Sequence, residues 1–153
     1  MHPPEITLYT IGFAGKSAEQ FFAILRRNNV RKILDVRLFN RSQLAGFTKQ
    51  RDLEYFLRAI LGVGYQHLPE FAPTKSLLDG YKKGHVSWDA YEREYLELIE
   101  KRRPHERLIQ NEADGACLLC SESSPDSCHR RLGAEYLKKQ WGNVRIVHLG
   151  PPL

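Results

Sequence analysis

The segment ACLLCSESSPDSCHRR, residues 116–131, passes from an apolar run through a polar loop into a basic stretch. The apolar run is typical of a buried strand. A helix is expected from about residue 128 to 141, because Leu132, Tyr136 and Leu137 are spaced to share one face. A buried strand that leads through a short loop into a helix is the beginning of a βαβ unit, so this segment favours a parallel α/β sheet.

Four other short runs have the composition of strands. Each is apolar or rich in β-branched and aromatic residues. They lie at residues 6–11, 32–36, 65–68 and 143–148. Together with the run at 116–120 they predict a sheet of about five strands.

Helices are expected between these strands. Apolar residues with helical spacing follow Ser17 and Ser87, which both suit an N-cap, and a further helix over about 53–61 ends at Gly62. Residues 69–85 contain proline and glycine, which indicates an irregular segment with one short helical turn. The alternation predicts a single three-layer α/β domain over the whole chain, with a mostly parallel sheet and helices on both faces.

Composition and charge indicate a cytoplasmic protein with an anionic partner. The 153-residue chain is 42% hydrophobic but has no apolar run near the roughly 18 residues of a membrane span, so no membrane association is expected. Three cysteines, an odd number, argue against a secreted disulfide framework and for reduced thiols. The net charge of +5 favours an anionic small molecule or nucleotide, with nucleic acid as the alternative.

Polar residues follow the predicted strands at the edge of the sheet where ligands bind. In parallel α/β sheets this edge is formed by the carboxyl ends of the strands, so the residues after each strand are expected to converge. The candidates for substrate binding are Gly12, Asp35, Arg37, Ser42, His67, His129 and Arg130. The candidates for catalysis are Cys120, Glu122 and Cys128.

Asp35 and Arg37 lie on one face of a strand end. They form an internal ion pair, or Asp35 orients Arg37 so that its guanidinium faces a carboxylate or phosphate, to which Ser42 adds a hydroxyl. Residues 10–17, TIGFAGKS, resemble a phosphate-binding loop, but Thr10 stands where that loop needs its first glycine. We therefore expect no nucleotide triphosphatase, and at most an anion bound by the amides of this turn.

The three cysteines have different expected roles. Cys117 and Cys120 are three residues apart on a strand, so their side chains point to opposite faces and cannot form a disulfide. Cys117 is expected to be a core residue. Cys128 is placed in the first turn of a helix capped by Asp126 or Ser127, where the helix dipole and neighbouring cations favour a thiolate; a structural Cys128 is the alternative.

Cys128, His129 and Arg130 are consecutive, so on a helix they project about 100° apart and at most two are expected to reach one ligand. Glu122 is either a general base or an acceptor for an arginine. The pairing of a strand-end cysteine with an arginine six positions later, as in phosphatases and sulfurtransferases, is absent because residue 126 is Asp.

No cofactor or metal is expected. The alternative is a zinc site that combines a strand-end thiol with the residues at the helix start. Its ligands would be Cys120, Cys128, His129 and His67. Adjacent Cys and His residues rarely bind one tetrahedral ion, which argues against this site.

The chain resembles the family called domain of unknown function 488 (DUF488). The resemblance is carried by short motifs over nearly the whole chain, of which C-x-E followed by C-H-R is the most specific. These motifs are YTIG at 9–12, DVR at 35–37 with RS at 41–42, YQHLPE at 65–70, LLCSE at 118–122, and CHR at 128–130. The resemblance implies an α/β fold in which the motifs gather in one pocket.

These observations lead to one functional hypothesis and one alternative. The hypothesis is a small hydrolase or transferase for a phosphorylated or nucleotide-like substrate, in which Arg37 and Arg130 clamp the anion. Nucleophilic or acid/base work then falls to Cys120, Glu122 or Cys128. The alternative is a non-catalytic nucleic-acid-binding or regulatory module, which the basic groups near residues 101–103 and 138–139 favour.

Overall fold

The computed structural model describes residues 4–39, 46–122, 125 and 128–150. Within these residues five strands form one sheet in the order β3-β2-β4-β1-β5, and each neighbouring pair is parallel. The strands are β1 (Ile6–Gly12), β2 (Lys32–Asp35), β3 (Gly64–His67), β4 (Ala116–Cys120) and β5 (Val144–His148). The predicted parallel sheet is confirmed.

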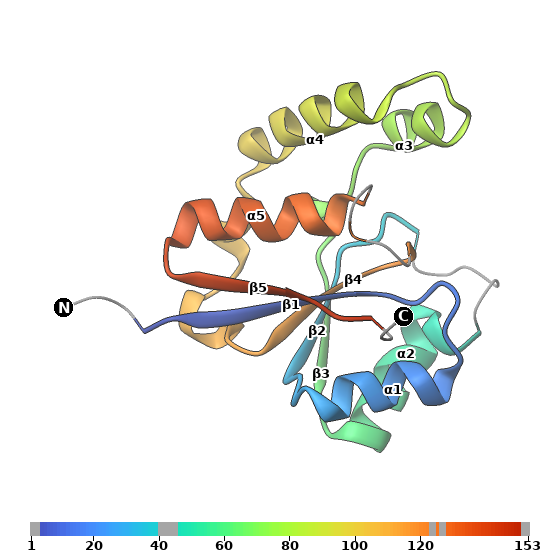
Figure 1. Cartoon of the computed structure of the whole chain (residues 1–153), viewed down its shortest axis with the longest axis vertical. Helices are drawn as coiled ribbons and strands as arrows, with labels where there is room; N and C mark the ends of the chain where they lie inside the picture. The colour runs from blue at the N-terminus through green and yellow to red at the C-terminus, as the bar shows by residue number, and fades with distance from the viewer. Residues whose placement is uncertain (1–3, 40–45, 123–124, 126–127, 151–153) are drawn as a thin grey trace.

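Helices cover both faces of this sheet, as the α/β prediction requires (Figure 1). On one face lie α1 (Ala18–Arg27) and α2 (Gln50–Phe56), which continues as a π-helical turn over Leu57–Leu61. On the other face lie α3 (Lys75–Lys82), α4 (Trp88–Arg102) and α5 (His129–Trp141). Short 3-10 turns are found at Gly46–Thr48, Pro69–Phe71, Pro104–Arg107 and Gln110–Ala113. None of the described helices is both long and apolar enough to cross a bilayer.

The sheet separates two hydrophobic cores, and β4 contributes to both. Leu118 and Cys120 pack in the core beneath α4 and α5, whereas Cys117 and Leu119 pack in the core against α1 and α2. This alternation follows from the two-residue repeat of a strand. Cys117 and Cys120 therefore lie on opposite faces, as predicted, and Cys117 is a core residue.

Local signals placed most helix ends correctly. Ser17 and Gln20 form a capping box at the start of α1, Ser87 caps α4, and Gly62 adopts φ +68° after the π-helical turn. The exception is the segment after Pro69, where the structure has an eight-residue helix, α3, instead of one short turn.

The glycine and threonine of this segment explain the error. Thr74 Oγ1 accepts a hydrogen bond from the Leu77 N–H and so starts α3. Gly80 lies inside this helix, and a Cβ at this position would come within 2.8 Å of Val86 Cγ2. This glycine permits close packing and does not break the helix.

The order of the strands places a topological switch point between β1 and β4. The chain leaves β1 through α1 on one face of the sheet and leaves β4 through α5 on the other, and the two connections run in opposite directions along the sheet (Figure 1). Ligands in open α/β sheets bind where the connections diverge in this way. Gly12 and Cys120 are register partners here, and Phe13 N–H donates to Cys120 O over 3.2 Å. The residues that follow both strands are thus held beside each other.

Candidate functional site

Arg130, in the first turn of α5, is fully buried behind the ends of β1 and β4. Its Nε donates to Thr10 Oγ1 over 3.2 Å, and its Nη1 donates to Cys120 Sγ over 3.0 Å and to the carbonyl oxygen of Glu122 over 2.5 Å. A buried guanidinium is costly without a negative partner. The sulfur of Cys120 is in position to supply that charge as a thiolate.

Cys120 and Cys128 share a hydrogen bond beside this guanidinium. Burial by itself would raise the pKa of Cys120, but the hydrogen bond from Cys128 and the charge and hydrogen bond of Arg130 outweigh burial and lower that pKa. Burial, together with the hydrogen bond to Cys120 and its charge, raises the pKa of Cys128 well above its ordinary value. Cys120 is therefore the more acidic thiol of the pair, and Cys128 keeps its proton and donates it to the hydrogen bond.

The structure corrects the predictions made for Cys128. It is itself the N-cap of α5, with an extended backbone (φ −138°, ψ 138°), and does not lie in the first helical turn. The caps predicted at Asp126 and Ser127 fall outside the described residues. Burial and the neighbouring Cys120 also overturn the expected Cys128 thiolate, since they raise its pKa more than the cations lower it.

The prediction that at most two of residues 128–130 reach one ligand stays a prediction. Arg130 reaches Cys120 Sγ, and His129 reaches the carbonyl oxygen of Val36 at 2.7 Å. The 100° rule applies only between residues in helical conformation, and Cys128 is an extended N-cap residue. Cys128 and His129 line the cleft described below, whereas Arg130 is not among its lining residues.

Arg37 follows β2 and is almost completely buried, with 4% of the residue exposed. Its Nε and Nη2 donate to the two carboxylate oxygens of Asp35 over 2.9 and 2.8 Å, and Nη2 also donates to Thr48 O over 2.7 Å. The guanidinium lies over the ring of Phe13, with its Cζ 5.5 Å from the ring centroid. Among the described residues no acceptor meets the buried Nη1. Arg37 is thus fixed on one edge and has unused donors on the other.

Asp35 and two histidines hold this arginine in place. Asp35 is fully buried and also accepts hydrogen bonds from the Tyr65 hydroxyl over 2.5 Å and from the Arg37 N–H over 3.1 Å. His67 Nε2 lies 2.9 Å from Arg37 O, and a carbonyl oxygen accepts, so this nitrogen donates. Burial lowers the pKa of His129 to about 4, so His129 is neutral near pH 7 and cannot act as a cationic clamp.

A cleft of about 240 Å³ opens beside these groups, between the ends of β2 and β4 and helices α3, α4 and α5. Five of the predicted site residues line it, namely Arg37, Cys120, Glu122, Cys128 and His129. Aromatic rings of Phe13, Tyr81 and Tyr91 form much of the remaining wall, and Lys82 is exposed at its edge. The cleft therefore combines a cysteine of lowered pKa, an arginine with unused donors and an apolar wall.

Gly12 supports the site from behind and does not line the cleft. A Cβ at this position would lie 1.4 Å from Glu122 O and 2.8 Å from Arg130 Nη1, so only glycine fits. Lys16, which the sequence suggested only as part of a weak phosphate-loop match, donates from Nζ to Gly12 O over 2.7 Å. Burial, and then the charge of Arg130, lowers the pKa of Lys16. Ser42, the remaining predicted residue, lies outside the described residues.

Sequence reasoning missed Thr10 and Tyr65, which hold Arg130 and Asp35 respectively. The strand repeat contains a signal for both. Thr10 is two residues before Gly12, and Tyr65 is two residues before His67, so each shares a strand face with a residue at the predicted site. A polar residue at such a position is a candidate for a hydrogen bond that orients a site residue.

The family comparison covers most of these elements. A sequence model described as a domain of unknown function, DUF488, matches residues 17–137. The chain belongs to the DUF488 family. No curated protein and no solved structure matches the chain significantly. The DUF488 match begins just before α1 and ends within α5, so it includes Arg37, Cys120 and Arg130.

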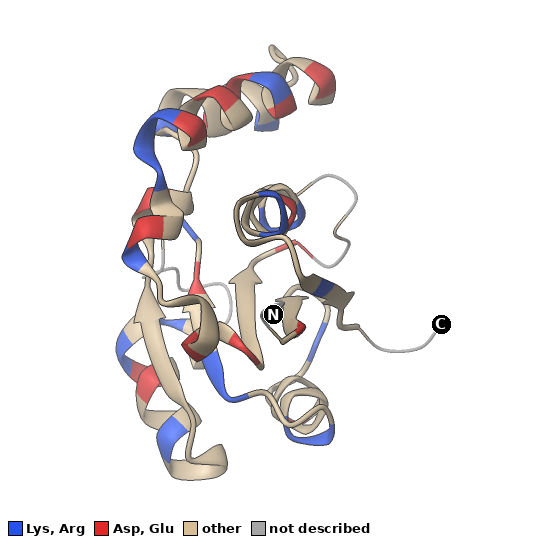
Figure 2. Ribbon diagram, turned by 90° about the vertical axis from the view of Figure 1, so that its left-hand side faces the viewer, with Lys and Arg blue, Asp and Glu red and all other residues tan. Residues whose placement is uncertain are grey.

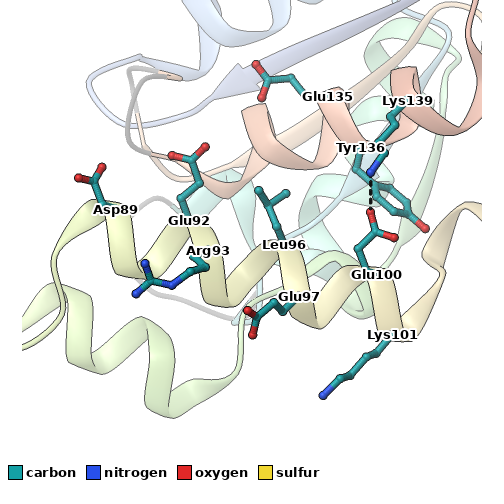
Figure 3. Close-up of a pocket in the computed structure, with 10 residues that line it drawn as sticks. All are labelled: Asp89, Glu92, Arg93, Leu96, Glu97, Glu100, Lys101, Glu135, Tyr136 and Lys139. Carbon is teal, nitrogen blue, oxygen red and sulfur yellow. Dashed lines mark hydrogen bonds and ion pairs between the residues drawn. The ribbon is translucent and has the colours of Figure 1, made fainter.

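A larger hollow of about 850 Å³ lies between α4 and α5 (Figure 3). Its walls are mainly charged side chains, and Lys139 Nζ bridges to Glu100 Oε1 over 3.3 Å. None of the site residues predicted for this DUF488 chain lines it. In the described part of the chain no cluster of three or more His, Cys, Asp and Glu residues is arranged to hold a metal ion. The smaller cleft is therefore the candidate functional site.

Proposed function

We propose that this DUF488 chain is a small enzyme that binds an anionic substrate in the cleft and uses the Cys120 thiolate as its nucleophile. One observation carries the proposal: the buried Nη1 of Arg37 meets no acceptor among the described residues, and Arg37 lines the same cleft as Cys120. An unpaired buried donor costs about 1–3 kcal/mol. A phosphate or carboxylate that accepts from Nη1 removes that cost.

The size and walls of the cleft favour a compact substrate. Its volume of about 240 Å³ is below the roughly 300–1,000 Å³ typical of drug-sized ligands. Phe13, Tyr81 and Tyr91 offer flat apolar surfaces. A small phosphate ester with a flat apolar group fits these features better than a whole dinucleotide.

The proposed reaction is a transfer of the bound group to sulfur. Arg37 holds the anion, while Cys120 Sγ attacks the electrophilic atom, forms a bond to it and displaces the leaving oxygen with the bonding electron pair. The leaving oxygen takes a proton from water or through Glu122, which is exposed on the cleft wall. Water or an acceptor then releases the group from sulfur, which gives a hydrolase or a transferase. Arg130 is a positioning residue because it acts through the Cys120 thiolate.

The cytoplasmic location remains part of the proposal. The three cysteines are free thiols, and a nucleophilic thiolate needs a compartment in which thiols stay reduced. Secretion into an oxidising compartment would oppose this chemistry.

Anion binding is tested with Arg37→Lys. Lysine keeps a positive charge opposite Asp35 but lacks the guanidinium edge that carries Nη1. The probes are inorganic phosphate and phenyl phosphate, measured by thermal unfolding. At about 100 times Kd a ligand stabilises the folded chain by about 2.7 kcal/mol, which raises Tm by several degrees. Arg107→Lys, a change at an exposed arginine that faces Glu70, should keep the shift.

The nucleophile is tested with two alkylating reagents that differ in charge. If Arg37 recruits anions, iodoacetate should label Cys120 faster relative to iodoacetamide in the folded parent protein than in the unfolded chain. Phosphate should protect Cys120, and Arg37→Lys should abolish the preference for iodoacetate. Two results together would contradict the proposal. The parent protein would show no melting shift with either phosphate probe, and the ratio of iodoacetate to iodoacetamide labelling would be the same in the folded and the unfolded chain.

The nucleic-acid alternative has weaker support. Acidic residues outnumber basic ones along α4 (Figure 2). Three of the cations that suggested nucleic-acid binding are also engaged within the protein. Arg102 Nη1 donates to Ala72 O over 2.6 Å, Arg103 pairs with Glu106, and Lys139 pairs with Glu100. This alternative predicts binding to DNA or RNA that weakens steeply with salt and persists in Cys120→Ser.

A further inference from the structure

Cys128 has no role in the proposed group transfer, yet it lies where a second thiol would matter. It lines the same cleft as Cys120 and is 4% exposed. Its thiol is hydrogen-bonded to the sulfur of Cys120, and Arg130 contacts both sulfurs. Two thiols of unequal acidity therefore line one cleft, and the guanidinium of Arg130 is fixed beside the more acidic one, Cys120.

We propose that Cys120 and Cys128 form a peroxide-reactive pair, in which Cys128 converts oxidised Cys120 to a disulfide. The chemical class of the substrate is a small hydroperoxide, with hydrogen peroxide as the simplest member. The inference shares Cys120 with the proposed function but does not depend on anion binding by Arg37.

The first step oxidises Cys120. Its thiolate attacks one oxygen of hydrogen peroxide, so that an S–O bond forms and the O–O bond breaks. The second oxygen leaves as hydroxide and takes a proton from solvent to become water. Cys120 is then a sulfenic acid, and the peroxide has been reduced by two electrons. Arg130 Nη1, 3.0 Å from the sulfur, stabilises the thiolate form of Cys120 that reacts with the peroxide.

The second step uses the proton and the sulfur of Cys128. Cys128 Sγ attacks Cys120 Sγ and forms the S–S bond, while the S–O bond breaks and the departing hydroxide takes the Cys128 proton to give a second water. In total, one hydrogen peroxide, the Cys120 thiolate, the Cys128 thiol and one proton from solvent give one disulfide and two waters. An external dithiol then reduces the disulfide by thiol–disulfide exchange, which restores both thiols and oxidises the dithiol.

Both cysteines lie at the ends of secondary-structure elements. Cys120 is the last residue of β4, and Cys128 is an extended N-cap residue before the first turn of α5. Their thiols are joined by a hydrogen bond. Formation of the S–S bond requires the two sulfurs to approach further, to the length of a disulfide.

Cys117 provides a matched control within the same strand. It is fully buried in the core on the opposite face of the sheet, and its thiol donates to Leu118 O over 3.8 Å. Burial raises its pKa far above the ordinary value. Cys117 should remain unoxidised under conditions that oxidise Cys120.

The experiment treats the reduced full chain with hydrogen peroxide, blocks free thiols with N-ethylmaleimide under denaturing conditions, and identifies the products by intact mass and peptide mapping. We expect an intramolecular Cys120–Cys128 disulfide that dithiothreitol reverses, with Cys117 still carrying the label. The rate of thiol loss should be about tenfold higher in the parent than in Cys120→Ser. Cys117→Ser should behave like the parent.

Cys128→Ser separates the two steps. This variant should still react with peroxide but stop at the sulfenic acid, which dimedone traps on Cys120. Three results would each overturn the inference. The first is disulfides that form only between chains, and the second is equal peroxide sensitivity of Cys117 and Cys120. The third is a parent protein that gains no disulfide under conditions in which the peroxide oxidises free glutathione. Arg107→Lys, at an exposed arginine outside the cleft, should form the disulfide at the parental rate. Phosphate binding and disulfide formation are measured separately in the parent, so failure of the anion proposal and failure of the thiol proposal give different results.

Discussion

Replacement of Gly12 by alanine tests whether the strand ends are packed as tightly as the structure indicates. The new Cβ would lie 1.4 Å from Glu122 O and 2.5 Å from its carbonyl carbon, whereas real Cβ atoms essentially never approach closer than 3.0 Å. The Glu122 carbonyl must therefore retreat by about 1.6 Å, or β1 must move by a similar distance. Retreat of the carbonyl breaks its hydrogen bond with Arg130 Nη1, and movement of β1 breaks the hydrogen bond between Arg130 Nε and Thr10 Oγ1.

The expected cost follows from these two effects. Overpacking of this kind costs about 1–3 kcal/mol, and loss of a hydrogen bond to a charged group costs about 1.5–3 kcal/mol. The reduced freedom of the unfolded chain offsets about 0.4–1 kcal/mol. Gly12→Ala should therefore lower the free energy of unfolding by about 2–5 kcal/mol.

Urea denaturation followed by circular dichroism measures this change. Gly64→Ala is the matched control, because Gly64 is also a strand residue but a Cβ there would lie 3.7 Å from Lys32 Cγ, an ordinary contact. The control should be within about 1 kcal/mol of the parent. A Gly12→Ala protein as stable as Gly64→Ala would refute the close approach of β1, Glu122 and Arg130.

Three further predictions concern hydrogen bonding and protonation at the site. Tyr65→Phe removes the hydroxyl that donates to buried Asp35 and should lower the free energy of unfolding in urea by about 1.5–3 kcal/mol; an unchanged midpoint would contradict this. The pKa of His129 falls from 6.5 to about 4 on folding, so between these values the unfolded chain binds more protons than the folded chain. Stability should therefore fall by up to about 3 kcal/mol as the pH drops from 6.5 to 4, and His129→Asn should lose this part of the pH dependence in urea melts at several pH values. Because the pKa of Cys120 is lowered and that of Cys117 is raised, iodoacetamide should label Cys120 at a lower pH than Cys117 in the folded protein; equal labelling profiles by mass spectrometry would argue against the thiolate.

The secondary structure was largely predictable because its signals are local. The capping box at Ser17 and the apolar run of β4 depend on residues within a few positions of each other. The eight residues of α3 were missed because Gly80 reads as a break until Val86 is known to pack against it. The parallel sheet followed from the alternation of strands and helices.

The identity of the site region was also predictable, because strand ends in parallel sheets meet on one edge. The roles of its residues were not. The spacing of Cys120 and Cys128 gave no indication that Arg130 lies beside the sulfurs, or that hydrogen bonds and the charge of Arg130 would lower the pKa of Cys120 despite its burial. Gly12 was predicted to bind substrate, whereas the structure uses it to admit the Glu122 carbonyl.

By itself the sequence determined the strands, the helices, the family motifs and the edge of the sheet at which they meet, since these depend on periodicity and on neighbours in the chain. Only the tertiary structure decided the strand order, the unmatched Nη1 of Arg37 and the division of protonation between Cys120 and Cys128. The physical reason is that protonation and hydrogen bonding of buried groups depend on burial and on atoms a few ångströms away. Those atoms belong to residues that are distant in the chain, as Thr10 and Arg130 are.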